Sequence, residues 1–203
     1  MKIKICGITS PEEIGFANEL LPDYIGFVFA ESRRRITPAQ AAALKANLSP
    51  SVLTAGVFVN QDIGEIRELC EAGVLDLVQI HGDEDAAYLE ALKKEINKPV
   101  IRAVRVRTHA DAERAIHIPA DFILFDAYRR DSYGGTGATF DLELLEGFKR
   151  PFFLAGGLDQ NNIAQSVRRI RPYCADVSSG AETDGKKDRR KMQNIINTVR
   201  SVE

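Results

Sequence analysis

The sequence is poor in cysteine. Its three cysteines, Cys6, Cys70 and Cys174, are odd in number and widely spaced, and no two of them form a C-x-x-C pair. Disulfide scaffolds and zinc ribbons depend on paired cysteines, so this usage argues against both classes. A reducing compartment fits better, and we expect a cytoplasmic protein.

The sequence also lacks an excess of charge and any long apolar run. Its 27 basic and 29 acidic residues give a formal net charge of -2, which offers no general attraction to nucleic acid or to an anionic membrane. The N-terminal apolar run is too short for a signal peptide, and no segment is long enough to span a bilayer. We therefore expect neither nucleic acid nor a membrane as a partner, and any phosphate must be bound by local features.

The 203 residues suit one domain covering residues 1–203, because a single core can grow until roughly 250 residues. Short apolar runs alternate along the chain with longer amphipathic stretches, which is typical of parallel strands covered on both faces. The sequence predicts eight such strands: Lys2–Cys6, Tyr24–Phe29, Val52–Val59, Leu75–Ile80, Val100–Val106, Phe122–Asp126, Phe152–Ala155 and Cys174–Val177.

A helical stretch with a polar start signal follows each predicted strand. Eight strands alternating with eight helices predict an α/β fold, either a closed (β/α)8 TIM barrel or a doubly wound sheet. We favour the barrel because of the count of eight and because of the turns after the last two strands. The helices are expected to begin near Thr9 or Ser10, Thr37, Asp62, Asp83, Thr108, Asp141 and Asp159, with the last one in residues 186–203.

Glycines and serines follow the last two predicted strands, which end before Gly156-Gly157 and Ser178-Ser179-Gly180. In barrels of this kind the working residues lie at the carboxyl ends of the strands. Glycines let backbone amides approach a ligand, and a short helix after the serines would point its amino end inward. The pair predicts a phosphate cradle, although two tight turns that need glycine would explain the same residues.

Reactive side chains end two other predicted strands. Cys6 ends the first, where a thiolate could remove a proton from carbon, but a small buried residue would fit the same position. Asp126 ends the sixth, where a partly desolvated carboxyl group could act as a general acid. A helix cap or an ion pair with Arg129 or Arg130 would explain Asp126 as well.

Three further features fall in predicted loops. The glycines of residues 134–137 could form a flap or supply amides for phosphate. Arg33, Arg34 and Arg35 could bind a carboxylate, while a solvated surface run explains at least two of them. His81 could polarise a substrate or satisfy a buried hydrogen bond. We expect no metal there, because no second histidine is placed near it.

A series of motifs runs in order along the chain: KICGIT (4–9), GFVF (26–29), SRRR (32–35), GVFVN (56–60), VQIHGDE (78–84), FDAY (125–128), GGTGATFD (134–141), FLAGGL (153–158) and DVSSGAE (176–182). Together they resemble the phosphoribosylanthranilate isomerase family, and they cover nearly the whole chain. The resemblance implies an isomerase of tryptophan biosynthesis with a TIM-barrel fold.

The reaction that the resemblance implies is the Amadori rearrangement of N-(5'-phosphoribosyl)anthranilate to 1-(2-carboxyphenylamino)-1-deoxyribulose 5-phosphate. It implies that Asp126 protonates the ring oxygen, so that the ring opens to an iminium ion, and that Cys6 then takes the proton from C2. No cofactor is implied, because the nitrogen of the substrate serves as the electron sink.

The resemblance also implies a set of substrate-binding residues. Arg34, flanked by Arg33 and Arg35, is implied to face the anthranilate. The remaining implied residues are Gly135, Gly137, Gly156, Gly157, Ser179 and Gly180 for the phosphate, and His81 and Asp176 in the pocket.

Two alternatives remain at this stage. A histidine-pathway sugar isomerase performs a similar rearrangement with two aspartates and grips two phosphates, so Cys6 and the single glycine cradle argue against it. A non-catalytic phosphosugar-binding barrel would keep the glycines and lose the acid and base. No exposed apolar stripe is obvious in the sequence, so we expect a monomer.

Overall fold

Eight parallel strands close into a barrel. In the computed structural model, which describes residues 1–127 and 142–202, each strand pairs with the next in sequence and the last pairs with the first. The predicted (β/α)8 barrel is confirmed, and the doubly wound sheet is wrong. The strands are β1 (Lys2–Cys6), β2 (Tyr24–Val28), β3 (Leu53–Phe58), β4 (Leu77–Ile80), β5 (Val100–Val106), β6 (Phe122–Ala127), β7 (Phe152–Ala155) and β8 (Cys174–Val177).

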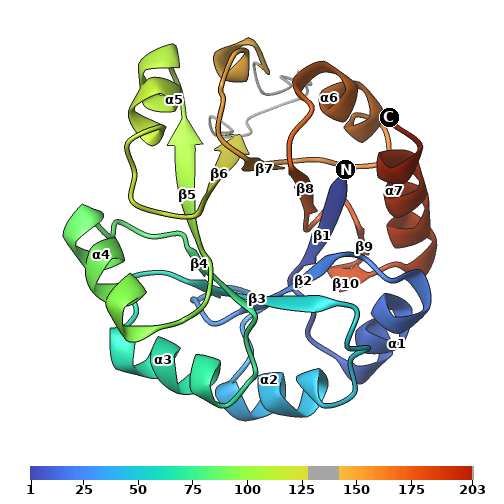
Figure 1. Ribbon diagram of the computed structural model, residues 1–203. Helices are drawn as coiled ribbons and strands as arrows, with labels where there is room; N and C mark the ends of the chain where they lie inside the picture. The colour runs from blue at the N-terminus through green and yellow to red at the C-terminus, as the bar shows by residue number, and fades with distance from the viewer. Residues whose placement is uncertain (128–141, 203) are drawn as a thin grey trace.

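Helices surround the barrel on its outside (Figure 1). Polar side chains accept hydrogen bonds from the first turn of several of them, as the start signals predicted at Ser10, Thr37, Asp62 and Thr108. No helix in the described part of the chain is long and apolar enough to cross a membrane. The helices are α1 (Pro11–Leu20), α2 (Pro38–Lys45), α3 (Ile63–Glu71), α4 (Ala86–Glu95), α5 (His109–Ala115), the 3-10 helix η1 (Leu142–Leu145), α6 (Ile163–Ile170) and α7 (Arg189–Ser201).

Two predicted helix starts are displaced. Helix α4 begins after Asp85 rather than after Asp83, because the Glu84 carboxylate accepts the backbone N–H of Gly82 and holds a turn before the helix. Helix α6 begins after Asn162, because the Asp159 carboxylate accepts two backbone N–H groups and holds a turn there. The start predicted at Asp141 lies outside the described residues.

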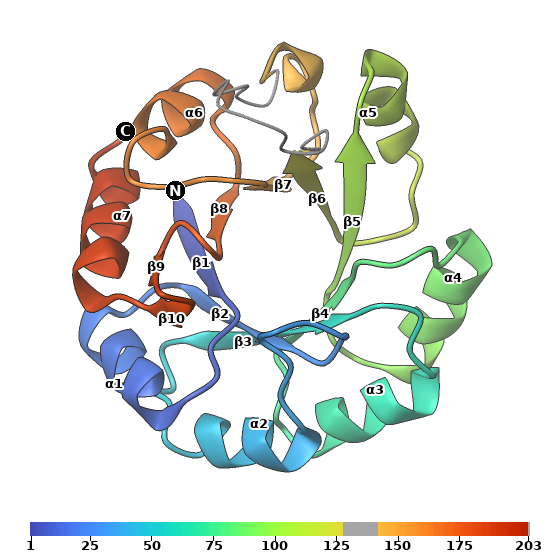
Figure 2. The ribbon, with the colours of Figure 1, turned by 180° about the vertical axis from the view of Figure 1, so that it is seen from behind.

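The short helix predicted after the serines of β8 is wrong. A two-stranded hairpin, β9 (Glu182–Thr183) and β10 (Lys186–Lys187), occupies this place. Asp184 and Gly185 between its strands have φ values of 51° and 81°, as a two-residue hairpin turn requires. The Lys187 backbone N–H donates to the Glu13 carboxylate of α1 at 2.9 Å. The hairpin therefore lies between α7 and α1, beside β1 (Figures 1 and 2).

Both faces of the barrel strands are buried, but by different residues. Ile3 and Ile5 of β1 pack in the layer between strands and helices, whereas Lys4 and Cys6 alternate with them and face the barrel interior. An apolar cluster fills much of the interior and reaches the carboxyl end of β7 at Ala155. Its members are Tyr24, Ala55, Leu77, Ile101, Ala103, Leu124, Phe153, Ala155 and Cys174.

Candidate active site

A thiol, an imidazole and a carboxyl group lie at the carboxyl ends of β1, β4 and β6. Cys6 is the last residue of β1, His81 follows β4, and Asp126 is the last residue but one of β6. All three residues are partly exposed. Nε2 of His81 lies 3.2 Å from Oδ2 of Asp126. The mouth of the barrel therefore offers groups that can give and take protons.

A layer of buried polar side chains lies directly beneath these groups. It consists of Lys4 on β1, Gln79 on β4 and Asp176 on β8, and we call it the polar layer. The Lys4 ammonium donates to Oδ2 of Asp176 at 2.8 Å and to Oε1 of Gln79 at 2.9 Å. Burial alone would lower the pKa of Lys4, but Asp176 and Cys6 together outweigh it and raise that pKa, so Lys4 remains charged. Asp176, predicted to bind substrate, is thus held by Lys4.

Arg34 is the member of the three-arginine run that lies at the barrel mouth. A Cβ on Gly7, just after β1, would be 2.3 Å from Cδ of Arg34, so the arginine crosses the end of β1 only because residue 7 is glycine. Gly7 also has a φ of 85°, which favours glycine. The side chain of Arg34 is 19% exposed, against 60% for Arg33 and 54% for Arg35.

The loops after β7 and β8 lie side by side, as a shared phosphate cradle requires. Gly180 forms a parallel bridge with Asp159, and a Cβ on Gly180 would be 2.0 Å from the carbonyl oxygen of Leu158. Gly156 and Gly157 both have positive φ values, of 91° and 67°. The sequence-predicted residues of the two loops, with Ser179 beside Gly180, are therefore brought together. Gly135 and Gly137 lie outside the described residues.

Comparison with known proteins identifies this combination of fold and site. The family model for N-(5'-phosphoribosyl)anthranilate (PRA) isomerase matches residues 3–198. The chain belongs to this family. It is 47% identical to the N-(5'-phosphoribosyl)anthranilate isomerase of Endomicrobium trichonymphae, over 99% of each chain.

Solved structures of similar fold support the same family assignment. A phosphoribosylanthranilate isomerase from Thermotoga maritima has a TM-score of 0.88 and 35% identity over 98% of both chains. A second, in complex with reduced 1-(o-carboxyphenylamino)-1-deoxyribulose 5-phosphate, has a TM-score of 0.86 and 34% identity over 98% of both chains. The predicted family is confirmed: the chain is an isomerase of the phosphoribosylanthranilate isomerase family, whose reaction belongs to tryptophan biosynthesis.

In this phosphoribosylanthranilate isomerase barrel, Arg34 is anchored by a carboxylate that the sequence analysis did not single out. Nε and Nη2 of Arg34 donate to the two oxygens of Glu182 at 2.6 and 2.8 Å, and Nη2 of Arg33 donates to the same group at 2.7 Å. The buried ammonium of Lys187 donates to Glu182 at 2.6 Å. Burial would raise the pKa of Glu182, but Arg34 and Lys187 lower it to about 2.

The electrostatic balance at Cys6 keeps the group a thiol. Burial raises the pKa of the Cys6 thiol above its ordinary value of 9.0, and the Asp176 carboxylate raises it further, although Lys4 and Lys187 act in the opposite direction. Cys70 and Cys174 are buried free thiols.

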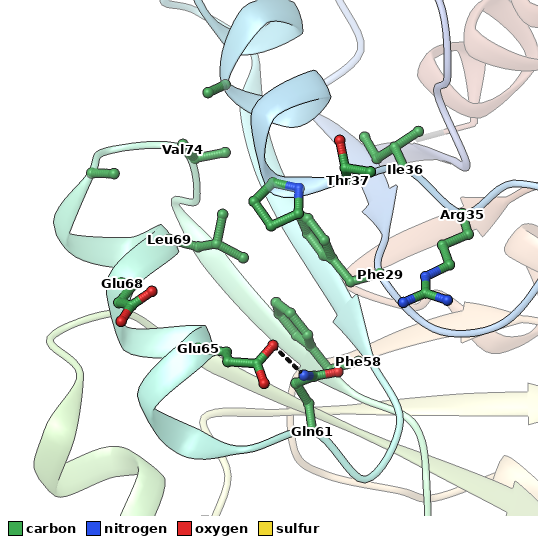
Figure 3. A pocket seen from close by; sticks show the side chains of 13 residues that line it. Phe29, Arg35, Ile36, Thr37, Phe58, Gln61, Glu65, Glu68, Leu69 and Val74 are labelled. Atoms are coloured by element: carbon green, nitrogen blue, oxygen red, sulfur yellow. Dashed lines mark hydrogen bonds between the residues drawn. The ribbon is translucent and has the colours of Figure 1, made fainter.

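A separate hollow of about 570 Å³ lies outside the barrel, between α2 and α3 (Figure 3). Phe29, Phe58, Leu69 and Val74 line it, and none of Cys6, His81 and Asp126 does. Arg35 lines this hollow and pairs with Glu31, so it is directed away from the barrel mouth. Among the described residues, no group of three or more His, Cys, Asp or Glu side chains is arranged to hold a metal ion.

Proposed function

We propose that Cys6 and Asp126 are the base and the acid with which this chain isomerises N-(5'-phosphoribosyl)anthranilate. The observation that carries the proposal is their placement. The ends of β1 and β6 direct a thiol and a carboxyl group into one barrel mouth, beside the paired glycine loops of β7 and β8. The structural relative in complex with reduced 1-(o-carboxyphenylamino)-1-deoxyribulose 5-phosphate supports a substrate of this kind.

The proposed reaction needs only proton transfers. The Asp126 carboxyl group protonates the furanose ring oxygen, the bond from C1 to that oxygen breaks, and an iminium ion forms. Beside this positive charge the Cys6 thiol loses its proton to solvent, and the resulting thiolate removes the proton from C2, so that the electron pair moves to give a neutral enolamine. Return of that proton to C1, with loss of the enol proton to the Asp126 carboxylate, yields the ketone and restores both groups. Each transfer is general acid–base catalysis.

The iminium intermediate explains how a thiol with a raised pKa can serve as the base. A positive charge beside Cys6 favours its thiolate form, and the ammonium groups of Lys4 and Lys187 already act in that direction. The thiolate is therefore favoured at the step that uses it.

The two negative groups of the substrate have separate partners at the barrel mouth. The Glu182 carboxylate accepts hydrogen bonds from Nε and Nη2 of Arg34. This leaves Nη1 of Arg34 to face the anthranilate carboxylate. The phosphate fits the loops of Gly156, Gly157, Ser179 and Gly180, where glycine lets backbone amides approach closely. Gly135 and Gly137 belong to the same proposal, and so do His81 and Asp176 as pocket residues.

The experiment follows the loss of anthranilate fluorescence from freshly made N-(5'-phosphoribosyl)anthranilate, with excess indoleglycerol-phosphate synthase to remove the product. We expect turnover by the parent that EDTA does not reduce. Cys6→Ser and Asp126→Asn should each lower kcat on the order of 10²–10⁴-fold. Cys70→Ser, which makes the same change at a free cysteine of helix α3, is the matched control and should keep parental kcat.

Two outcomes contradict the proposal. Near-parental kcat in either variant removes that residue's role. No turnover by the folded parent would move the substrate assignment to the phosphoribosyl-formimino compound of histidine synthesis, or to binding alone.

We further propose that the chain acts as a single-domain monomer in the cytoplasm. Large exposed apolar side chains in the described residues lie at both ends of the barrel rather than in one patch, as Leu53 at the start of β3 and Val59 just after its end illustrate. Three free thiols fit a reducing compartment. Because the Thermotoga maritima relative is described as dimeric, light scattering on a sizing column is the test, and a dimeric mass would refute the monomer.

A further inference from the structure

A chain of hydrogen bonds crosses the barrel from β8 to β6. It runs from the Asp176 carboxylate to Lys4, from Lys4 to Gln79, from Gln79 to His81 and from His81 to Asp126. Nε2 of Gln79 lies 3.0 Å from Nδ1 of His81. The polar layer is thereby linked to the acid at the barrel mouth by four contacts.

Only one arrangement of protons satisfies all of these contacts. A lysine ammonium has donors and no acceptor, so the Gln79 atom that faces Lys4 must be the amide oxygen. The NH2 group of Gln79 then faces His81 and donates to Nδ1, which must carry a lone pair. The ring proton of His81 is therefore on Nε2, and it points at Oδ2 of Asp126.

We propose that Lys4 and Gln79 are positioning residues that hold His81 in its neutral Nε2–H form, so that Asp126 delivers its proton from Oδ1. This proposal rests on the acid role of Asp126 given above. The His81 N–H occupies Oδ2 whether the carboxyl group is protonated or ionised. The transferable proton is thus confined to Oδ1, and the carboxylate left after the transfer keeps a donor.

The reversed tautomer would oppose the acid. With the proton on Nδ1, the Nε2 lone pair would face Asp126 and accept the proton of the carboxyl group. The acid would then be hydrogen-bonded to the histidine instead of presenting its proton to the substrate. Lys4 prevents this at a distance, because its charge fixes which end of the Gln79 amide faces the ring.

The test reads the histidine tautomer directly. The ring nitrogens are observed by nitrogen-15 NMR at about pH 8, where histidine is neutral. The spectrum is simple because the sequence has only three histidines. His81→Gln identifies the His81 signals by their loss. In the parent we expect a protonated Nε2 and an unprotonated Nδ1 at His81. A proton on Nδ1 would overturn the proposal without any measurement of turnover.

Gln79→Glu is the decisive variant. A carboxylate can still accept from Lys4, but it has no N–H for His81, so we expect protonation of Nδ1. As a result of this change of tautomer, kcat of Gln79→Glu should fall on the order of 10–100-fold, while KM stays close to parental. Gln79→Met, which removes both ends of the amide, should release the tautomer and lower kcat similarly.

Thr54→Val is the matched control. Thr54 is another fully buried polar residue of the barrel, on β3, and its hydroxyl hydrogen-bonds with the Val74 carbonyl and the Asp76 carboxylate. We expect a loss of stability with no change of the His81 tautomer and no comparable loss of kcat. An unchanged tautomer in Gln79→Glu, or a changed tautomer with parental kcat, would refute the proposal. No turnover by the parent would instead refute the function, and the NMR result would still decide the proton arrangement.

Discussion

Glu182 is predicted to stabilise the fold in a way that depends on pH. Its carboxylate is 4% exposed and accepts hydrogen bonds from Arg33, Arg34 and Lys187. Glu182→Gln keeps the size of the side chain and removes its charge. The buried ammonium of Lys187 then loses its counter-charge, and Arg34 loses its anchor over Gly7. We expect lower stability at neutral pH, because breaking a buried pair leaves an uncompensated charge.

The size of the effect follows from the pKa of Glu182. The folded protein lowers that pKa from its ordinary value of 4.5 to about 2. This difference corresponds to about 3 kcal/mol of stability. Burial lowers the pKa of Lys187 in spite of its bond to Glu182, so the cost of burying that ammonium offsets part of the gain. We therefore take about 3 kcal/mol as the upper end of the expected loss.

The sign of the pH dependence is fixed by the direction of the shift. The pKa of Glu182 is lower in the folded state than in the unfolded state, so its stabilisation is complete above pH 4.5. It is lost as the pH falls from 4.5 towards 2, where the folded group also takes up a proton. The difference between parent and variant should therefore be largest at neutral pH and shrink through this window.

Urea unfolding followed by circular dichroism provides the assay, since the chain has no tryptophan. The two proteins are compared near neutral pH and at about pH 3. Glu146→Gln is the matched control, because Glu146 is 55% exposed and pairs with Arg169 at the surface. Such a pair contributes only about 0–1 kcal/mol. A loss in Glu182→Gln that stays constant between the two pH values would refute the reasoning.

Three further predictions concern the interior and the mouth of the barrel. Lys4→Met leaves the Asp176 carboxylate without its cation, so urea titration should show a loss of about 3–5 kcal/mol in the free energy of unfolding. Most of this loss should be regained in the Lys4→Met, Asp176→Leu double variant. No recovery of stability in the double variant would contradict the pairing. Gly180→Ala puts a Cβ 2.0 Å from a backbone carbonyl oxygen and should lower the free energy of unfolding by about 1–3 kcal/mol in the same assay. Parental stability would show that the two loops can move apart. Arg34→Ala should raise KM on the order of 10-fold or more and change kcat less, whereas Arg33→Ala at the surface should change KM little; equal effects in steady-state kinetics would remove the distinction between them.

The strands were the most predictable part of the fold. β1, β5, β7 and β8 have the predicted bounds, because a strand buried on both faces is an apolar run with abrupt polar ends. Helix starts were predictable where one side chain caps one turn, as at Thr108. They were displaced at Asp83 and Asp159, where a carboxylate closes a turn before the helix. A single residue type does not distinguish these two uses of an aspartate.

The candidate site was predictable at strand ends and in loops, but its supports were not. Glu182 and Lys187 are brought together by the hairpin turn at Asp184-Gly185. The Asp-Gly dipeptide was a usable signal for that turn, whereas the choice of Arg34 as the partner of Glu182 needs the fold. Lys4 had a signal of its own, since a lysine inside a buried strand must face either a partner or water.

The alternation of side chains along the strands explains where the acid obtains its support. On β1 and β4 a polar residue lies two positions before the group at the mouth, since Lys4 precedes Cys6 and Gln79 precedes His81. On β6 the corresponding residue is Leu124, which is fully buried in the apolar cluster. Asp126 therefore has no polar residue beneath it on its own strand, and among the described residues its hydrogen-bond partner is His81 at the same barrel mouth. The hydrogen bonds that support Asp126 therefore come from β1 across the barrel, through Lys4, Gln79 and His81. Lys4 thus lies on the same strand as the proposed base, Cys6, and is linked to the proposed acid on β6.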